Sequence, residues 1–378
     1  MKITKRMMNK SAPIALALRR SKRILCFLSN LPQDIIRKIL GRLLIRSIMR
    51  CKYVCKSWRS MIEGEGGDFG MLHTPQPGLA FVHRDMGFEV CDEACEPLCH
   101  FDFPPPLKIY STTYLLRVVV GSTNGLILVC GIDARLCVCN PITSEYIKLP
   151  LQPADSHVVG FGVSKLSGQY KIICGAHVYT LGRGGGCWRG IVGATGRLRL
   201  PWENAVFFNG NLHWLTIDSK ENTLVCCFDL ETELYSNFSL PPPDHIIYDD
   251  GYPLYLNGGY QLCVLDGRLC LCDIVQPCRT VIWQMNTYGD ANSWVKAYAV
   301  GDIIGIILPL KVFANGDLLF AKSDDDQLYI YSKKTERHVK NAHLRQYKSY
   351  FYNIVTYIPS FLSLTAMGIP NVQSLSFY

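Results

Sequence analysis

Signals for tight turns recur at nearly regular intervals along most of this chain. Five residue pairs carry them, each ending in glycine: Asn124-Gly125, Ser167-Gly168, Asn209-Gly210, Asp266-Gly267 and Asn315-Gly316. Asn-Gly and Asp-Gly favour two-residue hairpin turns because both residues tolerate positive φ angles. The pairs are about 43, 42, 57 and 49 residues apart, close to the length of a four-stranded propeller blade. The spacing therefore predicts a repeated β-sheet unit.

A second repeated pattern falls between these turns. Residues 139–146, 228–235 and 331–338 each read as a strand, a polar turn and a further strand that opens on an aromatic or long side chain. Trp188 and Trp294 hold the equivalent place in two other repeats. Two interleaved signals with one period are typical of blades stacked around an axis rather than of a two-sheet sandwich. We expect a mainly antiparallel β-propeller from about residue 79.

The positive charge of the chain is confined to its beginning. The net charge is +8, and eight lysines and arginines precede Asp34, the first acidic residue. The remaining 31 basic residues balance the 31 acidic ones, so no basic groove for nucleic acid is expected. Since 48% of the residues are hydrophobic and 19% are charged, the chain can bury a large core and is not globally disordered.

The basic arm, residues 1–23, admits three interpretations: an organelle-targeting peptide, a nuclear-import patch around residues 19–23, or a disordered tail. A secretory signal is not expected, because the apolar run at residues 12–18 is short and is followed by Arg19 and Arg20. No apolar stretch is long enough to span a membrane; residues 303–310 have only the length of a buried strand. These observations favour the nucleus or the cytoplasm, without a membrane partner.

The chain contains 17 cysteines. Several occupy alternate positions of strand-like runs, as Cys137 and Cys139 or Cys270 and Cys272 do. In a reducing compartment they are expected to be free thiols that act as small core residues. Another reading makes zinc ligands of Cys91, Cys95, Cys99 and His100, but their spacing is not that of a common structural zinc site.

Residues 28–62 have the 3.6-residue period of helices. Pro32 and Asp34 suit a first helical turn, and Ile35, Ile36, Ile39, Leu40 and Leu43 form one apolar stripe of the helix that follows. Further short helices are expected at residues 46–53 and 54–62, the last carrying Trp58. Three helices of this size cannot bury all their apolar surface alone. Either the rest of this chain or a second protein must cover them.

These helices resemble the plant F-box. The similarity rests on LPQDII (residues 31–36), ILGRL (39–43) and VCKSWR (54–59). It implies docking on a Skp-type linker protein and, through it, on a cullin, with Trp58 as the anchor. The linker-binding residues that the resemblance implies are Leu31, Pro32, Ile35, Ile36, Ile39, Leu43, Val54, Cys55 and Trp58. Two positions depart from the pattern: Leu44 stands where the family often has proline, and Gly41 lies late in the first helix, where glycine costs about 1 kcal/mol relative to alanine.

The β body resembles the F-box-associated, kelch-like domain, through stretches such as residues 121–126, 208–214 and 265–271. The resemblance implies an α+β multidomain chain in which a three-helix F-box precedes the propeller. The expected segments are the arm (1–23), the F-box (24–62), a linker (63–78), the propeller domain (79–364) and a C-terminal tail (365–378).

The resemblance further implies a substrate-recognition subunit of an SCF ubiquitin ligase, which binds the linker and an unidentified target protein and has neither catalytic residues nor a cofactor. A glycan- or protein-binding module outside any ligase, or a propeller-based enzyme, would be the alternatives. Loops at residues 180–188, 241–251 and 287–294 are candidates for target binding. Their aromatic residues are Trp188, Tyr248, Tyr288 and Trp294, and Tyr252, directly after the second loop, is a further candidate.

Three further features are interpreted as structural. The glycine run at residues 182–186 lacks the Gly-Lys-Ser/Thr ending of a phosphate loop and is expected to be an inter-strand loop. Asp324, Asp325 and Asp326 lack a calcium-loop pattern and are expected to form a solvated turn. His213 is expected to be a structural residue beside Trp214.

Overall fold

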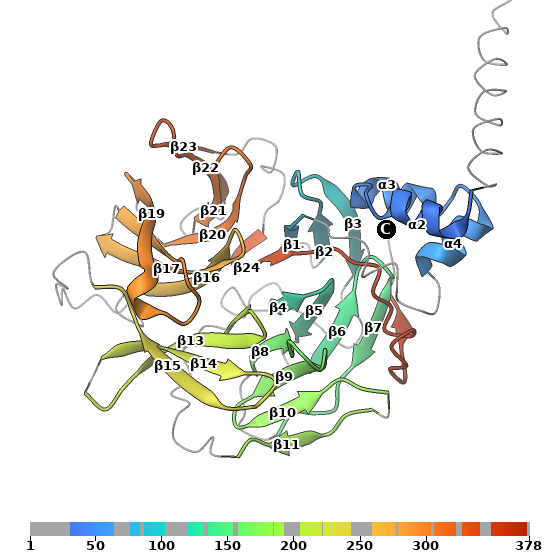
Figure 1. Cartoon of the computed structure of the whole chain (residues 1–378), viewed down its shortest axis with the longest axis horizontal. Coiled ribbons are helices and arrows are strands. Elements are labelled where there is room, and N and C mark those ends of the chain that lie inside the picture. Colours follow the sequence, from blue (N-terminus) through green and yellow to red (C-terminus); the bar gives the residue numbers. More distant parts are fainter. Residues whose placement is uncertain are drawn as a thin grey trace, which may run out of the picture.

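The computed structural model describes residues 31–63, 76–83, 87–102, 119–131, 135–153, 158–183, 185–192, 205–220, 222–242, 259–276, 279–303, 306–322, 327–340 and 349–375. Within these ranges, three short helices are followed by six antiparallel sheets arranged around a common axis, with the helices beside one edge of the ring (Figure 1). The predicted combination of a helical module and a β-propeller is confirmed.

The helices are α2 (Gln33–Leu40), α3 (Ile45–Cys51) and α4 (Lys56–Glu63). Pro32 precedes α2 with a φ of −53°, and Asp34 lies in its first turn, where a negative charge is favourable. Gly41 is the C-cap residue of α2 rather than a residue of its interior, so the cost of glycine inside a helix does not apply there. Leu44, the N-cap of α3, is extended at φ −61°.

Each sheet is one blade of the propeller. Blades 1 to 3 consist of the following strands: β1 (Gly78–His83), β2 (Gly87–Cys91), β3 (Pro97–Asp102) and β24 (Ser349–Tyr357) in blade 1; β4 (Val119–Thr123), β5 (Leu126–Cys130), β6 (Leu136–Asn140), β7 (Glu145–Lys148) and the two-residue β25 (Gln373–Ser374) in blade 2; β8 (Val158–Val163), β9 (Tyr170–Cys174), β10 (His177–Thr180) and β11 (Trp188–Gly190) in blade 3.

Blades 4 to 6 have four strands each: β12 (Val206–Phe208), β13 (Asn211–Ile217), β14 (Thr223–Asp229) and β15 (Tyr235–Ser239) in blade 4; β16 (Tyr260–Leu265), β17 (Arg268–Gln276), β18 (Arg279–Met285) and β19 (Trp294–Gly301) in blade 5, where the 3₁₀ turn η1 (Ala291–Ser293) precedes β19; β20 (Ile307–Val312), β21 (Leu318–Lys322), β22 (Gln327–Ser332) and β23 (Arg337–Lys340) in blade 6.

The two ends of the propeller meet in blade 1. Strand β24 is the innermost strand of that sheet and pairs antiparallel with β1, for example Leu79 with Thr356. The chain then continues past blade 2, where β25 pairs with β7 at the outer edge of the sheet. Residues 365–375, which belong to the segment expected as a tail, are thus held against blade 2. The ring is closed by main-chain hydrogen bonds between residues that are far apart in the chain.

The predicted turns occupy equivalent places in the blades. All five glycine pairs lie between the first and second strands of blades 2 to 6, and Asn124 and Gly125 have φ angles of +49° and +81°. A Cβ atom at Gly125 would lie only 2.5 Å from Ser360 Oγ, so glycine is needed there for space as well as for conformation. The second pattern forms the turns between third and fourth strands, where Ser144, Glu233 and Glu336 also have positive φ.

Neighbouring blades share their hydrophobic cores. Each of six buried clusters contains residues of two adjacent sheets, and one of them also contains residues of the helices. Leu262 and Leu271 of blade 5, for example, pack with Leu215 and Val225 of blade 4. Because an antiparallel strand alternates its side chains between two faces, every blade contributes to two clusters. In blade 2, Cys137 and Cys139 face blade 1 while Val138 faces blade 3.

The cysteines are part of these cores. The 15 cysteines that the structure describes are free thiols, and most are buried. Burial raises the pKa of thiols such as Cys95, to about 11, and Cys174, to about 12, because a thiolate would lose its hydration. We therefore expect mass spectrometry of the native protein, denatured without reductant, to find free thiols. Several stoichiometric disulfides would contradict the expected reducing compartment.

Candidate functional site

The helical module exposes several large apolar side chains. We call Ile35, Ile39, Leu44, Tyr53 and Val54 the exposed apolar set; their exposed fractions run from 41% for Ile39 and Val54 to 80% for Tyr53. These five belong to only 33 residues, 31–63, whereas the rest of the described chain contributes eight large exposed apolar residues. Single exposed apolar residues are normal, but such a concentration on a small module marks an interaction site.

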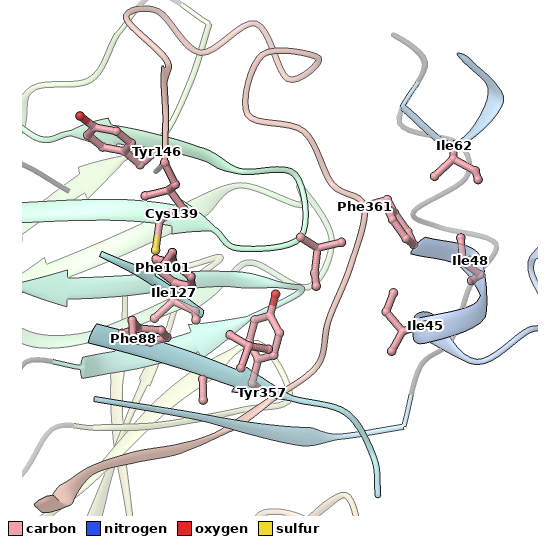
Figure 2. Packing of buried hydrophobic residues seen from close by; sticks show 14 of the residues in the cluster. Ile45, Ile48, Ile62, Phe88, Phe101, Ile127, Cys139, Tyr146, Tyr357 and Phe361 are labelled. Atoms are coloured by element: carbon pink, nitrogen blue, oxygen red, sulfur yellow. The ribbon is translucent and has the colours of Figure 1, made fainter. Parts of the chain in front are cut away.

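Other apolar side chains of the same helices are buried. Ile36 and Leu40 of α2, Ile45 and Ile48 of α3, and Trp58 and Ile62 of α4 belong to one cluster with residues of blades 1 and 2. Figure 2 shows Phe361 lying between Ile45 and Ile48 of α3 and the propeller residue Tyr357. The apolar side chains of the helices are therefore divided into two sets: one is buried in a cluster shared with blades 1 and 2, and the other faces solvent.

The nine predicted linker-binding residues fall into three groups. Pro32, Ile35, Ile39, Val54 and Cys55 are exposed, Leu31 and Leu43 are partly buried, and Ile36 and Trp58 are buried at 4% and 8% exposure. Trp58, the predicted anchor, thus packs within the chain. Leu44 and Tyr53 are exposed apolar residues outside the predicted set; Leu44 was noted only as a departure from the F-box pattern, and nothing in the sequence singled out Tyr53.

A charged contact joins the helices to blade 1. The Arg46 guanidinium of α3 donates to Asp92 Oδ2 from Nη2 at 2.7 Å and from Nε at 3.0 Å, and to the Pro97 carbonyl oxygen at 2.9 Å. Asp92 Oδ1 accepts from the amides of Ala94 and Glu96 in the turn between β2 and β3. Since the side chain of Asp92 is only 8% exposed, this ion pair is less screened by solvent than a surface pair.

Replacing Arg46 by alanine is expected to weaken this junction. The change leaves a mostly buried carboxylate without its cation, but Arg46 is itself 37% exposed, so the loss should be about 1 kcal/mol rather than the several expected for a fully buried pair. Urea unfolding of the full chain would measure it. Arg50→Ala, at an exposed position of the same helix, is the matched control, and equal effects of the two changes would contradict the assignment.

Two of the candidate target-binding aromatics connect neighbouring blades. Trp188 Nε1 donates to the Pro150 carbonyl beyond blade 2 at 3.2 Å, and its ring packs on Tyr179. Trp294, 7% exposed, donates in the same way to the Ser239 carbonyl of blade 4 at 3.3 Å. Both residues open the fourth strand of their blades, as the repeat predicted, and both hold the preceding blade. Tyr248 and Tyr252 lie outside the described residues.

Tyr288, the remaining candidate, completes a buried polar network between blades 4 and 5. Its hydroxyl lies 2.8 Å from His213 Nε2 and accepts from Asn211 Nδ2 at 2.9 Å. His213 Nδ1 lies 3.2 Å from the Val206 carbonyl, which assigns the proton to Nδ1 and the acceptor role to Nε2. Burial lowers the pKa of His213 to about 4, opposed by the hydrogen bond to Val206. His213 is therefore neutral at pH 7 and structural, in agreement with the interpretation from the sequence.

This histidine should make the propeller less stable in mild acid. The ordinary pKa is 6.5 and the folded pKa is about 4, so between these values only the unfolded chain binds the proton, and stability falls as the pH falls through that window. The loss between pH 7 and pH 5 should be roughly 2 kcal/mol. His213→Gln is expected to flatten this dependence in urea unfolding at the two pH values. An unchanged slope in the variant would show that other groups cause it.

The alternative chemical sites find no support in the described geometry. Cys91 and Cys95 face blade 6, whereas Cys99 faces blade 2, so the proposed zinc ligands lie on opposite sides of blade 1. Within the described ranges, no group of three or more His, Cys, Asp or Glu could hold a metal ion. The first element after the glycine run is strand β11 and not a helix, as expected for an inter-strand loop. Asp324, Asp325 and Asp326 lie outside the described residues. No helix of the described chain is long and apolar enough to cross a membrane.

Comparison with known families and proteins agrees with this two-part organisation. A model of the F-box domain matches residues 28–66, and a model described as the F-box associated beta propeller domain matches residues 107–364. The chain is similar to three Arabidopsis thaliana proteins. F-box protein At2g34280 is 26% identical over 81% of this chain and 92% of its own length. F-box protein At3g07870 is 28% identical over 72% and 73%, and putative F-box/kelch-repeat protein At3g22730 is 26% identical over 72% and 77%.

Proposed function

Because this chain belongs to the family of F-box proteins with an F-box associated beta-propeller domain, we propose that it is the substrate-recognition subunit of an SCF ubiquitin ligase. The F-box binds a Skp-type linker protein and, through it, a cullin. The propeller binds a target protein, which is then ubiquitinated and degraded by the proteasome. The subunit itself acts as an adaptor without catalytic chemistry, in the nucleus or the cytoplasm.

The divided apolar surface of the helices is the observation that supports this proposal most directly. An isolated three-helix module needs a cover for its whole apolar surface. Here Ile36, Ile48 and Trp58 are buried in the cluster that the helices share with blades 1 and 2, while Ile35 and Ile39 of α2 remain exposed. The exposed apolar residues of such a helical module can bind a partner protein while its buried residues keep it attached to the propeller.

The adaptor works through proximity. A target bound to the propeller and an enzyme bound through the cullin are held in one complex, so the effective concentration of the target's lysines rises without any new chemistry. The buried contact of Arg46 with Asp92 and the packing of Ile45 and Ile48 against Phe361 would keep the two binding parts in a constant relative position.

The connections between successive blades are the proposed target-binding surface. Such loops vary freely while the sheets hold their ends, and several are long in sequence: residues 103–118 before β4, 191–205 before β12 and 240–259 before β16. The last of these carries Tyr248 and Tyr252. Trp188 and Trp294 stabilise this surface indirectly. Each donates a hydrogen bond to the preceding blade, and the connections between these blades form the surface.

Co-purification tests the proposal. The full-length chain, expressed with a Skp-type linker from the same organism, is expected to form a stoichiometric complex, and residues 24–62 are expected to contain the binding determinants. Addition of the cullin should then yield an active ligase on a target found by proximity labelling in cells with a blocked proteasome. If no Skp-type protein binds the full-length chain, the ligase function fails and a binding module outside any ligase is left.

A further inference from the structure

The inner strands of the six blades enclose a cavity on the propeller axis. Its volume is about 420 Å³, and residues of all six blades line it, from β4, β12, β16, β20 and β24 together with Phe161 of β8. This size falls within the range of roughly 300–1,000 Å³ of small-molecule sites. None of the residues that line the cavity belongs to the helical module.

The wall of the cavity is mostly apolar and carries a few polar side chains. The inner strands all run in the same direction, because each blade adds four antiparallel strands, so the position along a strand gives the depth. Apolar lining residues occur along the whole length of the inner strands, as Val119, Leu262, Leu308 and Leu310 show. Polar side chains gather at the end of β4, at Ser122, Thr123 and Asn124, with Gln261 near the start of β16.

Two mostly buried polar side chains of the wall have no hydrogen-bond partner among the residues that the structure describes. Gln261 and Thr123 are each only 6% exposed, and neither side chain makes a hydrogen bond to any part of the chain that the structure describes. Nearby amides are satisfied, since Asn124 Nδ2 donates to the Tyr170 hydroxyl and Asn209 Oδ1 accepts from Lys165. The carboxamide of Gln261, which lines the cavity beside Leu262 and Cys263, is therefore available to pair with a molecule inside the cavity.

The wall also favours uncharged molecules over ions. None of the described lining residues carries a charged side chain. An ion that entered would lose its hydration and find no opposite charge, which is strongly unfavourable. An uncharged molecule with an apolar body loses little on entry and gains from the burial of its apolar surface.

We propose that the axial cavity binds an uncharged small organic molecule. Its apolar body packs against Val119, Leu262 and Leu308, and a carbonyl, hydroxyl or amide group of the molecule pairs with the carboxamide of Gln261. The polar end of the molecule faces Ser122 and Thr123. The ligand would contact several blades at once and thereby stabilise the ring.

Titration of the full chain with the uncharged dye Nile red tests this site, with the anionic dye 8-anilinonaphthalene-1-sulfonate as the charged comparison. A Cβ at Gly121 would contact only Phe161, at 3.8 Å, so Gly121→Leu places its side chain in the cavity. We expect saturable one-to-one binding of Nile red with blue-shifted emission, at least tenfold weaker binding of the anionic dye, and at least tenfold weaker binding of Nile red to Gly121→Leu. Gln261→Met, similar in length but without the amide, should bind several-fold more weakly.

Two controls separate the cavity from exposed apolar surface. Leu166→Ala, at an 86% exposed position of blade 3, should bind the dye as the unchanged chain does, and circular dichroism should show that Gly121→Leu is folded. If that variant does not fold, hydrogen exchange of the unchanged chain decides: Nile red should protect peptides covering β4 and β16. Absence of saturable binding, equal binding by a folded Gly121→Leu, or protection confined to residues 31–63 would overturn the proposal.

Discussion

Replacing Ile35 and Ile39 together by alanine is expected to reduce linker affinity about 100-fold, because two apolar contacts of roughly 1.5 kcal/mol each would be lost. The two residues lie one turn apart on the open face of α2 and are 42% and 41% exposed. Alanine is a good helix former, so α2 itself should persist. Calorimetry with the purified linker would measure the affinity.

Thermal unfolding of the same double variant gives the control. Since both side chains face solvent, the midpoint of unfolding should change little, and target binding should be retained. Leu166→Ala, a comparable truncation on a propeller turn, should leave linker affinity unchanged. Linker binding by the double variant at full affinity would show that the exposed apolar set is not the docking surface.

Replacing Trp58 by alanine should have the largest effect on stability. Its side chain is 8% exposed and belongs to the cluster that joins α4 to α2, α3 and blades 1 and 2. Truncating a buried tryptophan costs about 3–5 kcal/mol. The helices should therefore detach from the propeller or unfold, and linker binding should be lost with them. Blades 4 and 5, which share no cluster with Trp58, should remain folded.

Hydrogen exchange can separate this packing role from the anchor role that the F-box resemblance implies. If Trp58 mainly packs within the chain, peptides from residues 31–63 lose protection in Trp58→Ala while those of β13 and β17 keep it. If the variant loses linker binding while its helices stay fully protected from hydrogen exchange, Trp58 contacts the linker directly. Its side chain then becomes exposed to the linker on binding. Tyr53→Ala, at an 80% exposed position, is the matched aromatic truncation.

Local patterns were sufficient to predict the kinds of element and their repetition. Pairs such as Asn124-Gly125 and Asp266-Gly267 form the predicted turns because the preference for positive φ belongs to the residues themselves. The apolar stripe of α2 and the glycine after it also define a helix and its end without help from distant residues. The helical module and the repetitive antiparallel body could therefore be recognised from residue order alone.

Long-range packing accounts for what these patterns left open. The number of blades depends on how many sheets close the ring, and closure depends on β24 pairing with β1 near the other end of the chain. Likewise, periodicity places Ile35, Ile36 and Ile39 on one stripe, yet the folded chain buries Ile36 in the cluster that the helices share with blades 1 and 2 and leaves Ile35 and Ile39 exposed. An apolar side chain does not by itself specify which surface will cover it. Hydrophobic burial is non-directional and depends on how the whole chain is folded. The same holds for Trp188 and Trp294, whose Nε1 groups are paired by carbonyls of the preceding blade.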